Sequence, residues 1–330
     1  MPPTTPDTYP KHISNLAYSS KSSLNTLDII LPREYNRHDS SKIWIIYIHG
    51  GAWRSPTNTS LGVLPSLPFL FPSSTFPSSS QYSSQHIAGI ASLNYRLSPH
   101  PDFPNPENDP ARIARHPQHL DDICDALRWL AKEWGLRDGG FVVVGHSAGG
   151  CLGLQVCMGV GGKVNNGGDG DGNGDLDVAL KIPMPVAVLS LEPITDIELL
   201  VENHREVPLY EEFTRAAFGE DRRIWREASP VCGNYEGWVR GGGKLVVLGM
   251  SKGDELVEWE QATGMKDVLL EQGWKDVEKD EEVSAKEVVL LELEGKHDEI
   301  WAEGRELARA VEFTLKRLVE NGYLRRELGR

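Results

Sequence analysis

The chain has 330 residues, of which 34 are lysine or arginine and 48 are aspartate or glutamate, so its formal net charge is −14. With 39% hydrophobic and 25% charged residues it can bury a large core, which excludes a disordered or fibrous protein. An acidic chain repels phosphate backbones, and the sequence has no basic stripe to offset this repulsion, so nucleic acid is not an expected partner.

Targeting and redox features favour a cytoplasmic protein. The longest apolar run, Ile43 to Ile48, is much shorter than the roughly 20 residues that span a bilayer. The N-terminal residues MPPTTPDTYPKHIS lack the apolar segment of a secretory signal. The four cysteines stand mostly in apolar surroundings, which is typical of buried, reduced thiols; they are Cys124, Cys151, Cys157 and Cys232.

Short apolar, β-branched runs recur along the chain and predict buried strands. Several runs are continuous rather than alternating in hydropathy, which is typical of strands covered by helices on both faces. Helical patterns separate many of the runs, so the sequence predicts a doubly wound α/β fold with a mostly parallel central sheet. The predicted strands are Leu24–Leu31, Ile43–Ile48, Ile87–Leu93, Phe141–Val144, Val186–Leu191, Leu245–Leu248 and Val288–Leu293.

Two segments have the clearest helical pattern. In HLDDICDALRWLAKEW, residues 119–134, apolar side chains recur three and four positions apart, which predicts an amphipathic helix. The segment from Ile300 to about Leu318 has a similar apolar face, and we expect it to pack on the sheet after the last strand.

Two stretches resemble surface insertions. Residues 72–85 are rich in serine and residues 161–178 in glycine and aspartate, so both are expected to form mobile surface loops. Because strand signals continue on both sides of each stretch, we predict a single domain over residues 1–330, with residues 1–20 as an extended N-terminal segment.

The strongest chemical signal is FVVVGHSAGG, a predicted strand followed by Gly145-His146-Ser147-Ala148-Gly149 and then a helical run. A sharp strand-to-helix turn of this kind holds a serine in strained backbone geometry, and small residues two positions on either side allow the strand and the helix to approach. We therefore expect Ser147 to be a nucleophile.

A second glycine-containing turn follows the predicted strand in WIIYIHGGAWRS, with the motif His49-Gly50-Gly51-Ala52-Trp53. In acyl transfer, the tetrahedral oxyanion needs preorganised N–H donors. The backbone N–H of Gly50 or Gly51, together with that of Ala148, is expected to supply them.

A serine nucleophile needs a base, and in this kind of fold the chain order is serine, acid, histidine. Of the ten histidines, His146 directly precedes Ser147, and only His204 and His297 follow it. His297 comes directly after the strand pattern VVLLELE, and strand carboxyl ends are where an open α/β sheet presents its ligands. His204 stands in the polar run VENHREV, so His297 is the preferred base.

The acid is expected at another strand end, and KLVVLGMSKGDEL provides Asp254. It would accept the Nδ1–H of His297 and so hold the required tautomer. Glu255 and Asp196 are the competing candidates, with Asp196 in reserve because it also follows a strand signal, whereas Asp298 is expected to be solvated.

The segment DGDGNGDLDVAL resembles a calcium loop in part. Asp169, Asp171, Asn173 and Gly174 occupy positions one, three, five and six, but position twelve is Leu180 rather than the required glutamate. We therefore expect no calcium site there.

With these motifs the chain resembles the α/β-hydrolase superfamily from Leu24 to the C-terminal helix. It resembles the fungal kynurenine formamidases more closely. The segment HGGAW is a signature of that family, whereas lipase-like esterases commonly have HGGG. Residues 192–219, EPITDIELLVENHREVPLYEEFTRAAFG, also resemble the formamidase segment that covers the active site. The segment NYRLSP, residues 94–99, is shared with the esterases and does not discriminate.

This resemblance implies that the protein hydrolyses N-formyl-L-kynurenine to L-kynurenine and formate, in tryptophan degradation and the supply of nicotinamide precursors. It implies that neither a cofactor nor a metal is needed. The aromatic residues Trp53, Tyr95 and Trp301 are candidates to line a substrate pocket, although packing in the core or a loop is the more common role of each.

Two other functions remain open at this stage. A carboxylesterase acting on small acyl esters would have the same strand-to-helix turn around the serine (the elbow), the same HGG loop with N–H donors (the oxyanion loop) and the same order of triad residues. A non-catalytic member of the fold would use the pocket to bind a ligand. The Ala52-Trp53 pair favours the formamidase, and the presence of all three triad candidates argues against loss of catalysis. A homodimer is an option for which the sequence offers no interface argument.

Overall fold

The computed structural model describes residues 8–71, 81–158, 182–276 and 286–324. The strands are β1 (Lys11–Ala17), β2 (Thr26–Leu31), β3 (Ile43–Ile48), β4 (Ile87–Leu93), β5 (Phe141–His146), β6 (Ala187–Leu191), β7 (Leu245–Ser251), β8 (Lys275–Asp276) and β9 (Glu287–Leu293). Within the described ranges they form one nine-stranded sheet in the order β1-β2-β4-β3-β5-β6-β7-β9-β8. The pairs β1–β2 and β2–β4 are antiparallel and the others are parallel.

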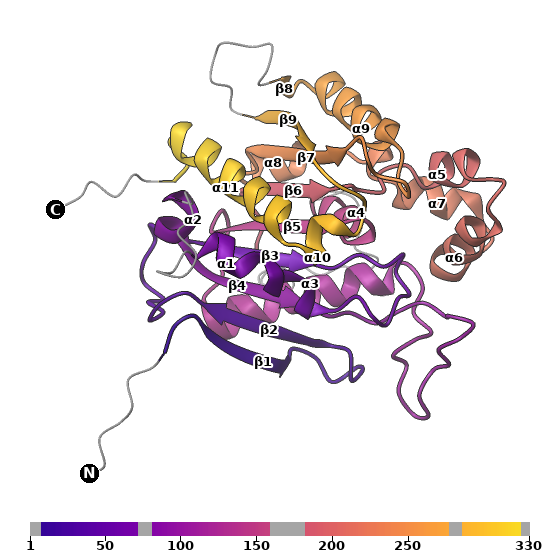
Figure 1. Cartoon of the computed structure of the whole chain (residues 1–330), viewed down its shortest axis with the longest axis horizontal. Helices are drawn as coiled ribbons and strands as arrows, with labels where there is room; N and C mark the ends of the chain where they lie inside the picture. The colour runs from indigo at the N-terminus through magenta and orange to yellow at the C-terminus, as the bar shows by residue number, and fades with distance from the viewer. Residues whose placement is uncertain (1–7, 72–80, 159–181, 277–285, 325–330) are drawn as a thin grey trace, which may run out of the picture.

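Helices cover both faces of this sheet (Figure 1). One face carries α1 (Leu67–Leu70), α2 (Gln81–His86), α10 (Glu299–Ala302) and α11 (Arg305–Glu320). The other carries α3 (Gln118–Trp134), α4 (Ala148–Cys157), α8 (Glu236–Arg240) and α9 (Trp259–Glu271). A third group follows β6 and lies beside the sheet, at the right of Figure 1; it consists of α5 (Ile197–Asn203), α6 (Pro208–Phe218) and α7 (Arg222–Ala228). The predicted α/β fold with a mostly parallel sheet is confirmed.

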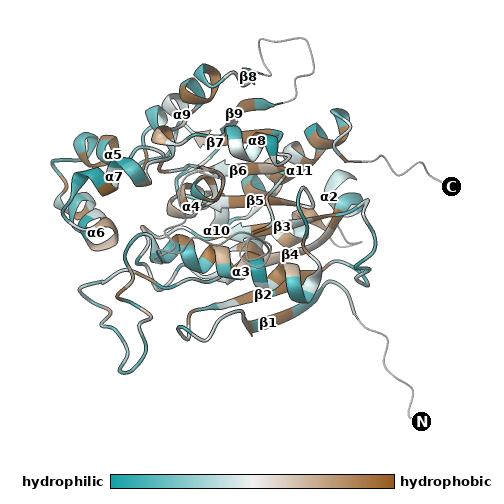
Figure 2. Ribbon diagram, turned by 180° about the vertical axis from the view of Figure 1, so that it is seen from behind, coloured by the Kyte–Doolittle hydropathy of each residue, from teal (hydrophilic) through white to brown (hydrophobic). Residues whose placement is uncertain are grey.

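The central strands are apolar on both sides because a core lies on each side of the sheet. All six residues of β3 are buried. Its alternate residues Trp44, Ile46 and Ile48 join the core beneath α3 and α4, whereas Ile43, Ile45 and Tyr47 join the core beneath α11. Figure 2 shows the resulting contrast between hydrophobic strands and the hydrophilic outer sides of the helices.

The predicted C-terminal helix is in fact two helices. Gly304, between α10 and α11, has a φ of +72°, in the left-handed region that favours glycine. A Cβ atom at this position would lie 2.2 Å from the backbone carbon of Pro65, so the break also permits a close backbone contact. The apolar periodicity continues across the break, which is why the sequence pattern did not reveal it.

The predicted surface insertions lie largely outside the described residues, including all of the calcium-like segment. The prediction of a loop is wrong for the last part of the serine-rich stretch, because Gln81–His86 forms α2. The carboxylate of Glu312 on α11 accepts hydrogen bonds from the backbone N–H groups of Tyr82 and Ser83, at 2.7 and 2.8 Å. These contacts satisfy N–H groups that a helix N-terminus otherwise leaves free.

Two further details differ from the expectations. Strand β1 was not predicted, because its sequence KHISNLA alternates between partly buried and exposed residues at the edge of the sheet. All four cysteines are free thiols, as expected; Cys151 and Cys157 are buried, but Cys124 is only partly buried and Cys232 is exposed. None of the helices in the described ranges has the length and apolar character of a membrane span.

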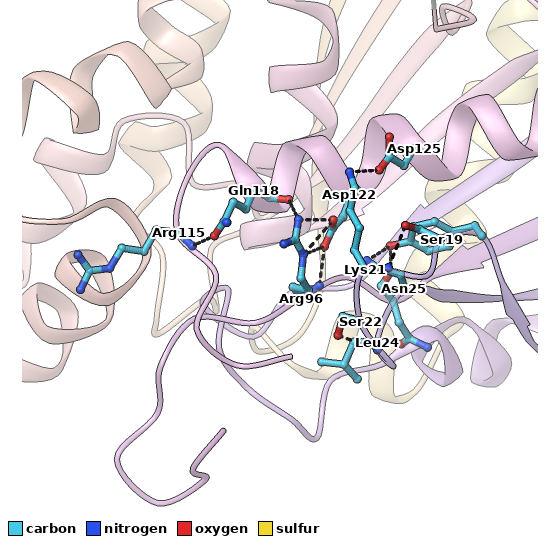
Figure 3. A network of polar contacts seen from close by, with 12 residues as sticks. Ser19, Lys21, Ser22, Leu24, Asn25, Arg96, Arg115, Gln118, Asp122 and Asp125 are labelled. Carbon is cyan, nitrogen blue, oxygen red and sulfur yellow. Dashed lines mark hydrogen bonds and ion pairs between the residues drawn. The ribbon is translucent and has the colours of Figure 1, made fainter. Parts of the chain in front are cut away.

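A buried ion pair fixes the loop that follows β4 (Figure 3). The Asp122 carboxylate on α3 is fully buried and accepts hydrogen bonds from the Arg96 backbone N–H, Nε and Nη2, at 3.0, 2.8 and 2.7 Å. The same loop reaches the site described below, since the Ser98 N–H donates to the Trp53 carbonyl at 2.8 Å. A partly exposed pair, Lys21 with Asp125, lies nearby at 2.6 Å.

We predict that Asp122→Ala destabilises the fold by about 3 to 5 kcal/mol, because it leaves the Arg96 guanidinium buried without its partner. The matched control is Asp125→Ala, which removes a partly exposed carboxylate from the same helix and should cost less than about 1 kcal/mol. Urea unfolding followed by circular dichroism measures both. Equal losses in the two variants would contradict this ranking.

Candidate active site

Ser147 lies at the turn between β5 and α4, and its backbone is strained. Its φ of 53° and ψ of −120° fall in a region that residues with a Cβ atom rarely adopt. The Ser147 N–H donates to the Leu191 carbonyl at the end of β6, at 2.8 Å, which holds the turn against the neighbouring strand. The side chain is only 5% exposed.

Glycines permit the close approach that this turn requires. A Cβ atom on Gly145 would lie 2.2 Å from the Gly149 carbonyl oxygen, and a Cβ atom on Gly149 would lie 2.2 Å from the Ile48 carbonyl oxygen. Real Cβ atoms do not come this close to backbone atoms. A larger residue at position 149 would push the turn away from the end of β3, and one at position 145 would separate β5 from α4. The steric role expected of the two glycines is therefore present.

The HGGAW loop after β3 touches the elbow. A Cβ atom on Gly50 would lie 3.0 Å from the Cβ of Ser147 and 2.9 Å from the carbonyl oxygen of His146. The Tyr95 hydroxyl donates to the His49 carbonyl at 3.0 Å. Because a trans peptide points its C=O and N–H in opposite directions, this bond turns the Gly50 N–H away from Tyr95.

The same loop is anchored to the helices beside the sheet. Trp53 is fully buried, and its ring packs edge-on against Phe218 of α6 at a centroid distance of 4.8 Å. The next residue, Arg54, pairs with Glu212 of α6 at 2.8 Å. Trp53 therefore attaches α6 to the HGGAW loop and leaves no surface open to a ligand.

The other two aromatic candidates also have packing roles. Tyr95 is 1% exposed and stacks on the His49 ring at a centroid distance of 4.5 Å. Trp301 is half-buried, lies against Gly62, and donates from its indole nitrogen to Asp298 at 2.9 Å. The Asp298 carboxylate is therefore engaged with Trp301 rather than with His297.

The structure brings His297 and Asp254 together. His297 follows β9 and Asp254 follows β7, two neighbouring parallel strands whose carboxyl ends meet at one edge of the sheet. The Nδ1 of His297 lies 2.8 Å from Oδ2 of Asp254. A carboxylate accepts here, so Nδ1 carries the hydrogen and Nε2 is left with its lone pair.

The competing candidates have other partners. Asp196 is the N-cap of α5 and accepts from the Leu199 N–H at 3.0 Å. His204 is not fully solvated, as its sequence context suggested; it stacks on Tyr210 at 3.9 Å and lies 3.2 Å from Glu258. Glu255 is exposed, and its carboxylate accepts from the backbone N–H of His297 at 3.3 Å rather than from the ring.

A second histidine joins the elbow to the His297 loop. The Nε2–H of His146 donates to the His297 carbonyl oxygen at 3.0 Å, and the two rings lie 4.6 Å apart. Burial, and then the proximity of His297, lower the pKa of His146 well below its usual range, although the hydrogen bond opposes this shift. Burial also lowers the pKa of His49 to about 4. Both side chains are therefore neutral at neutral pH.

Sequence reasoning missed one residue of this site, Glu192. Its side chain is fully buried, and Oε2 lies 3.3 Å from Nδ1 of His297 and 3.4 Å from Nε2 of His146. The signal that could have identified it is its position directly after β6, which is the neighbour of both β5 and β7. In a parallel sheet, residues at adjacent strand ends share one edge.

These three side chains are the group in the described ranges that most resembles a metal site, since their ligand atoms lie within 4.8 Å of one another. Metal ligation requires unprotonated ring nitrogens. Here the two nitrogens that face Glu192 both carry hydrogens, which they donate to Asp254 and to the His297 carbonyl. The donor set therefore does not suit a resident cation.

The chain is similar to characterised proteins over most of its length. A sequence family described as "Alpha/beta hydrolase family" matches residues 45–290. A kynurenine formamidase-like hydrolase, fscH, of Fusarium equiseti is 32% identical over 93% of this chain and 96% of its own. The kynurenine formamidase of Meyerozyma guilliermondii is 33% identical over 71% of this chain and 74% of its own.

Solved structures agree on the fold. A truncated carbohydrate esterase from gut microbiota aligns with a TM-score of 0.61 over 95% of this chain and 99% of its own, at 17% sequence identity. At this level of identity the likeness concerns the fold alone. The sequence matches, which are stronger, show that the chain is a hydrolase of the α/β-hydrolase family and belongs, within it, with the kynurenine formamidases and their relatives.

Proposed function

We propose that this protein hydrolyses N-formyl-L-kynurenine to L-kynurenine and formate, with Ser147 as nucleophile, His297 as base and Asp254 as the acid that orients it. The observation that carries the proposal is the 2.8 Å contact between His297 Nδ1 and Asp254 beside a strained serine turn. The identity of the relatives supports the choice of substrate.

In the first half of the reaction, Ser147 Oγ attacks the formyl carbon while Nε2 of His297 takes the hydroxyl proton. Asp254 keeps the hydrogen on Nδ1 and stabilises the imidazolium that forms. When the tetrahedral intermediate collapses, the C–N bond breaks and His297 gives its proton to the departing aryl amine. Serine then carries the formyl group as an ester.

In the second half, water attacks the formyl ester and His297 takes a proton from it. Collapse of the second tetrahedral intermediate breaks the bond to Ser147 Oγ, returns a proton to the serine and releases formate. In both halves the negative oxygen needs N–H donors. We assign these to Ala148 and to Gly50 or Gly51, in accordance with the close approach of Gly50 to Ser147.

The chemistry of the substrate matches an esterase-like triad. An aryl amine is weakly basic and leaves more readily than an alkyl amine, and the formyl group is the smallest acyl group. Neither step needs an oxidant, a reductant or a metal ion. An ester with a good leaving group should therefore also react. The property that distinguishes a formamidase from a carboxylesterase is thus the preference for the formamide over the ester.

We predict that the purified protein cleaves N-formyl-L-kynurenine with a much higher kcat/KM than a short-chain nitrophenyl ester. Ser147→Ala and His297→Ala should each lower kcat by about 10⁶-fold, because triad members act as one unit. The absorbance of released kynurenine follows the reaction. Circular dichroism of each variant serves as the control for folding. Ester turnover with negligible formamide cleavage would reassign the protein to the carboxylesterases.

The acid is tested by a pair of aspartate variants. Asp254→Asn should lower kcat by about 10⁴-fold, because an amide in that position favours the wrong histidine tautomer. The matched control is Asp196→Asn, which retains a side chain that caps α5 equally well and should leave turnover near the wild-type value. The opposite pattern, with Asp196→Asn inactive and Asp254→Asn active, would refute the assignment of the acid.

A further inference from the structure

Glu192 adopts an unusual backbone conformation directly after β6. Its φ of 47° is in the left-handed region, which favours glycine over a residue with a long side chain. Its N–H donates to the Gly249 carbonyl at 2.7 Å, so the turn is tied to β7. The backbone is therefore held in the conformation that directs the Glu192 side chain toward the elbow and the His297 loop, where its contacts lie.

The Glu192 carboxyl group is enclosed between two imidazole rings. It contacts Nδ1 of His297 and Nε2 of His146, at 3.3 and 3.4 Å, but both of these N–H groups have shorter bonds to other acceptors. Among the described residues, neither carboxyl oxygen has a well-aligned hydrogen bond. An ionised carboxylate without strong donors is costly to bury, which favours the neutral acid.

The surrounding charges act in the same direction. Burial is the largest influence and raises the pKa of Glu192 to about 10, reinforced by the carboxylates of Asp254, Glu255 and Asp298. The backbone N–H of Ser251 opposes this shift. A raised pKa in an acid means that the proton is retained at neutral pH.

We propose that Glu192 is a positioning residue, a neutral carboxylic acid that holds the His297 ring against Asp254 and links it to His146 of the elbow. This inference rests on the proposed triad. Glu192 lies against Nδ1 of His297, on the side of the ring away from the atom that exchanges the proton with serine, so it acts through His297 and does not touch the substrate.

The neutral state has a consequence for the base. Two ionised carboxylates beside one imidazole would favour the imidazolium form, which cannot accept the Ser147 proton. With Glu192 neutral, Asp254 is the single negative partner of the ring. Glu192 thus packs against the His297 ring and presents a polar group to Nδ1 without adding a second negative charge.

The test uses diisopropyl fluorophosphate, which reacts with an activated serine whatever the natural substrate is. The rate constant of inactivation and the apparent binding constant are measured from pH 5 to 9 for wild type, Glu192→Gln and Glu192→Gly, and the labelled residue is identified by mass spectrometry. Glycine tolerates the φ of 47°, so Glu192→Gly removes the side chain without straining the backbone. The matched charge control is Glu255→Gln, which removes an exposed carboxylate from the same site.

We expect Glu192→Gln to react at close to the wild-type rate with an unchanged pKa on the acid side of the profile, because an amide replaces a neutral acid. Glu192→Gly should react about 100-fold more slowly with an unchanged binding constant, because small displacements of a catalytic group cost about this much. Circular dichroism monitors folding. If Glu192→Gly does not fold, Glu192→Asp, which withdraws the carboxyl by one methylene, takes its place and should also be slow.

Three results would overturn the inference in distinguishable ways. If Glu192→Gln lowers the acid-side pKa by more than about one unit, and by more than Glu255→Gln does, then Glu192 is ionised. If Glu192→Gly, or Glu192→Asp in its place, reacts as fast as wild type, Glu192 does not position His297. If wild-type Ser147 is not labelled at all, the proposed function fails and the inference fails with it.

Discussion

The arrangement of the site depends on the close contact between two backbone turns, one after β3 and one after β5. These strands are parallel neighbours, so their carboxyl ends lie side by side, with Ile48 opposite Gly145. Only a residue without a Cβ atom at position 149 allows this approach, because a Cβ atom there would lie 2.2 Å from the Ile48 carbonyl oxygen. Ser147 and the loop that faces it are therefore placed by one steric constraint.

A second constraint is electrostatic. The edge of the sheet around Ser147 collects buried histidines and carboxyl groups whose charges cannot all be maintained in a desolvated environment. Burial keeps His49 and His146 neutral and favours the protonated form of Glu192. The buried neighbours of the His297–Asp254 pair are therefore held in neutral form, and the Asp254 carboxylate fixes the tautomer of the His297 ring.

The helices beside the sheet are joined to this centre rather than standing apart from it. Trp53 packs on α6, Arg54 pairs with Glu212, and the Tyr210 hydroxyl on α6 donates to the Leu256 carbonyl near Asp254 at 2.8 Å. A rearrangement of α6 would therefore reach both the HGGAW loop and the loop that carries Asp254.

Local sequence determined the parallel strands, the glycine turns and the candidates Ser147, Asp254 and His297, because each depends on a pattern within a few neighbouring residues. It also predicted the α/β fold, since apolar runs alternate with helical patterns. The sequence did not predict the break at Gly304, because the apolar periodicity continues across it. It did not predict strand β1, because the alternation of apolar residues there is weak. Only the tertiary structure decided that Asp254 rather than Asp196 lies beside His297, and that Glu192 lies between His146 and His297. These residues are far apart in the chain, and the order of the strands in the sheet, which no local pattern encodes, brings their side chains together.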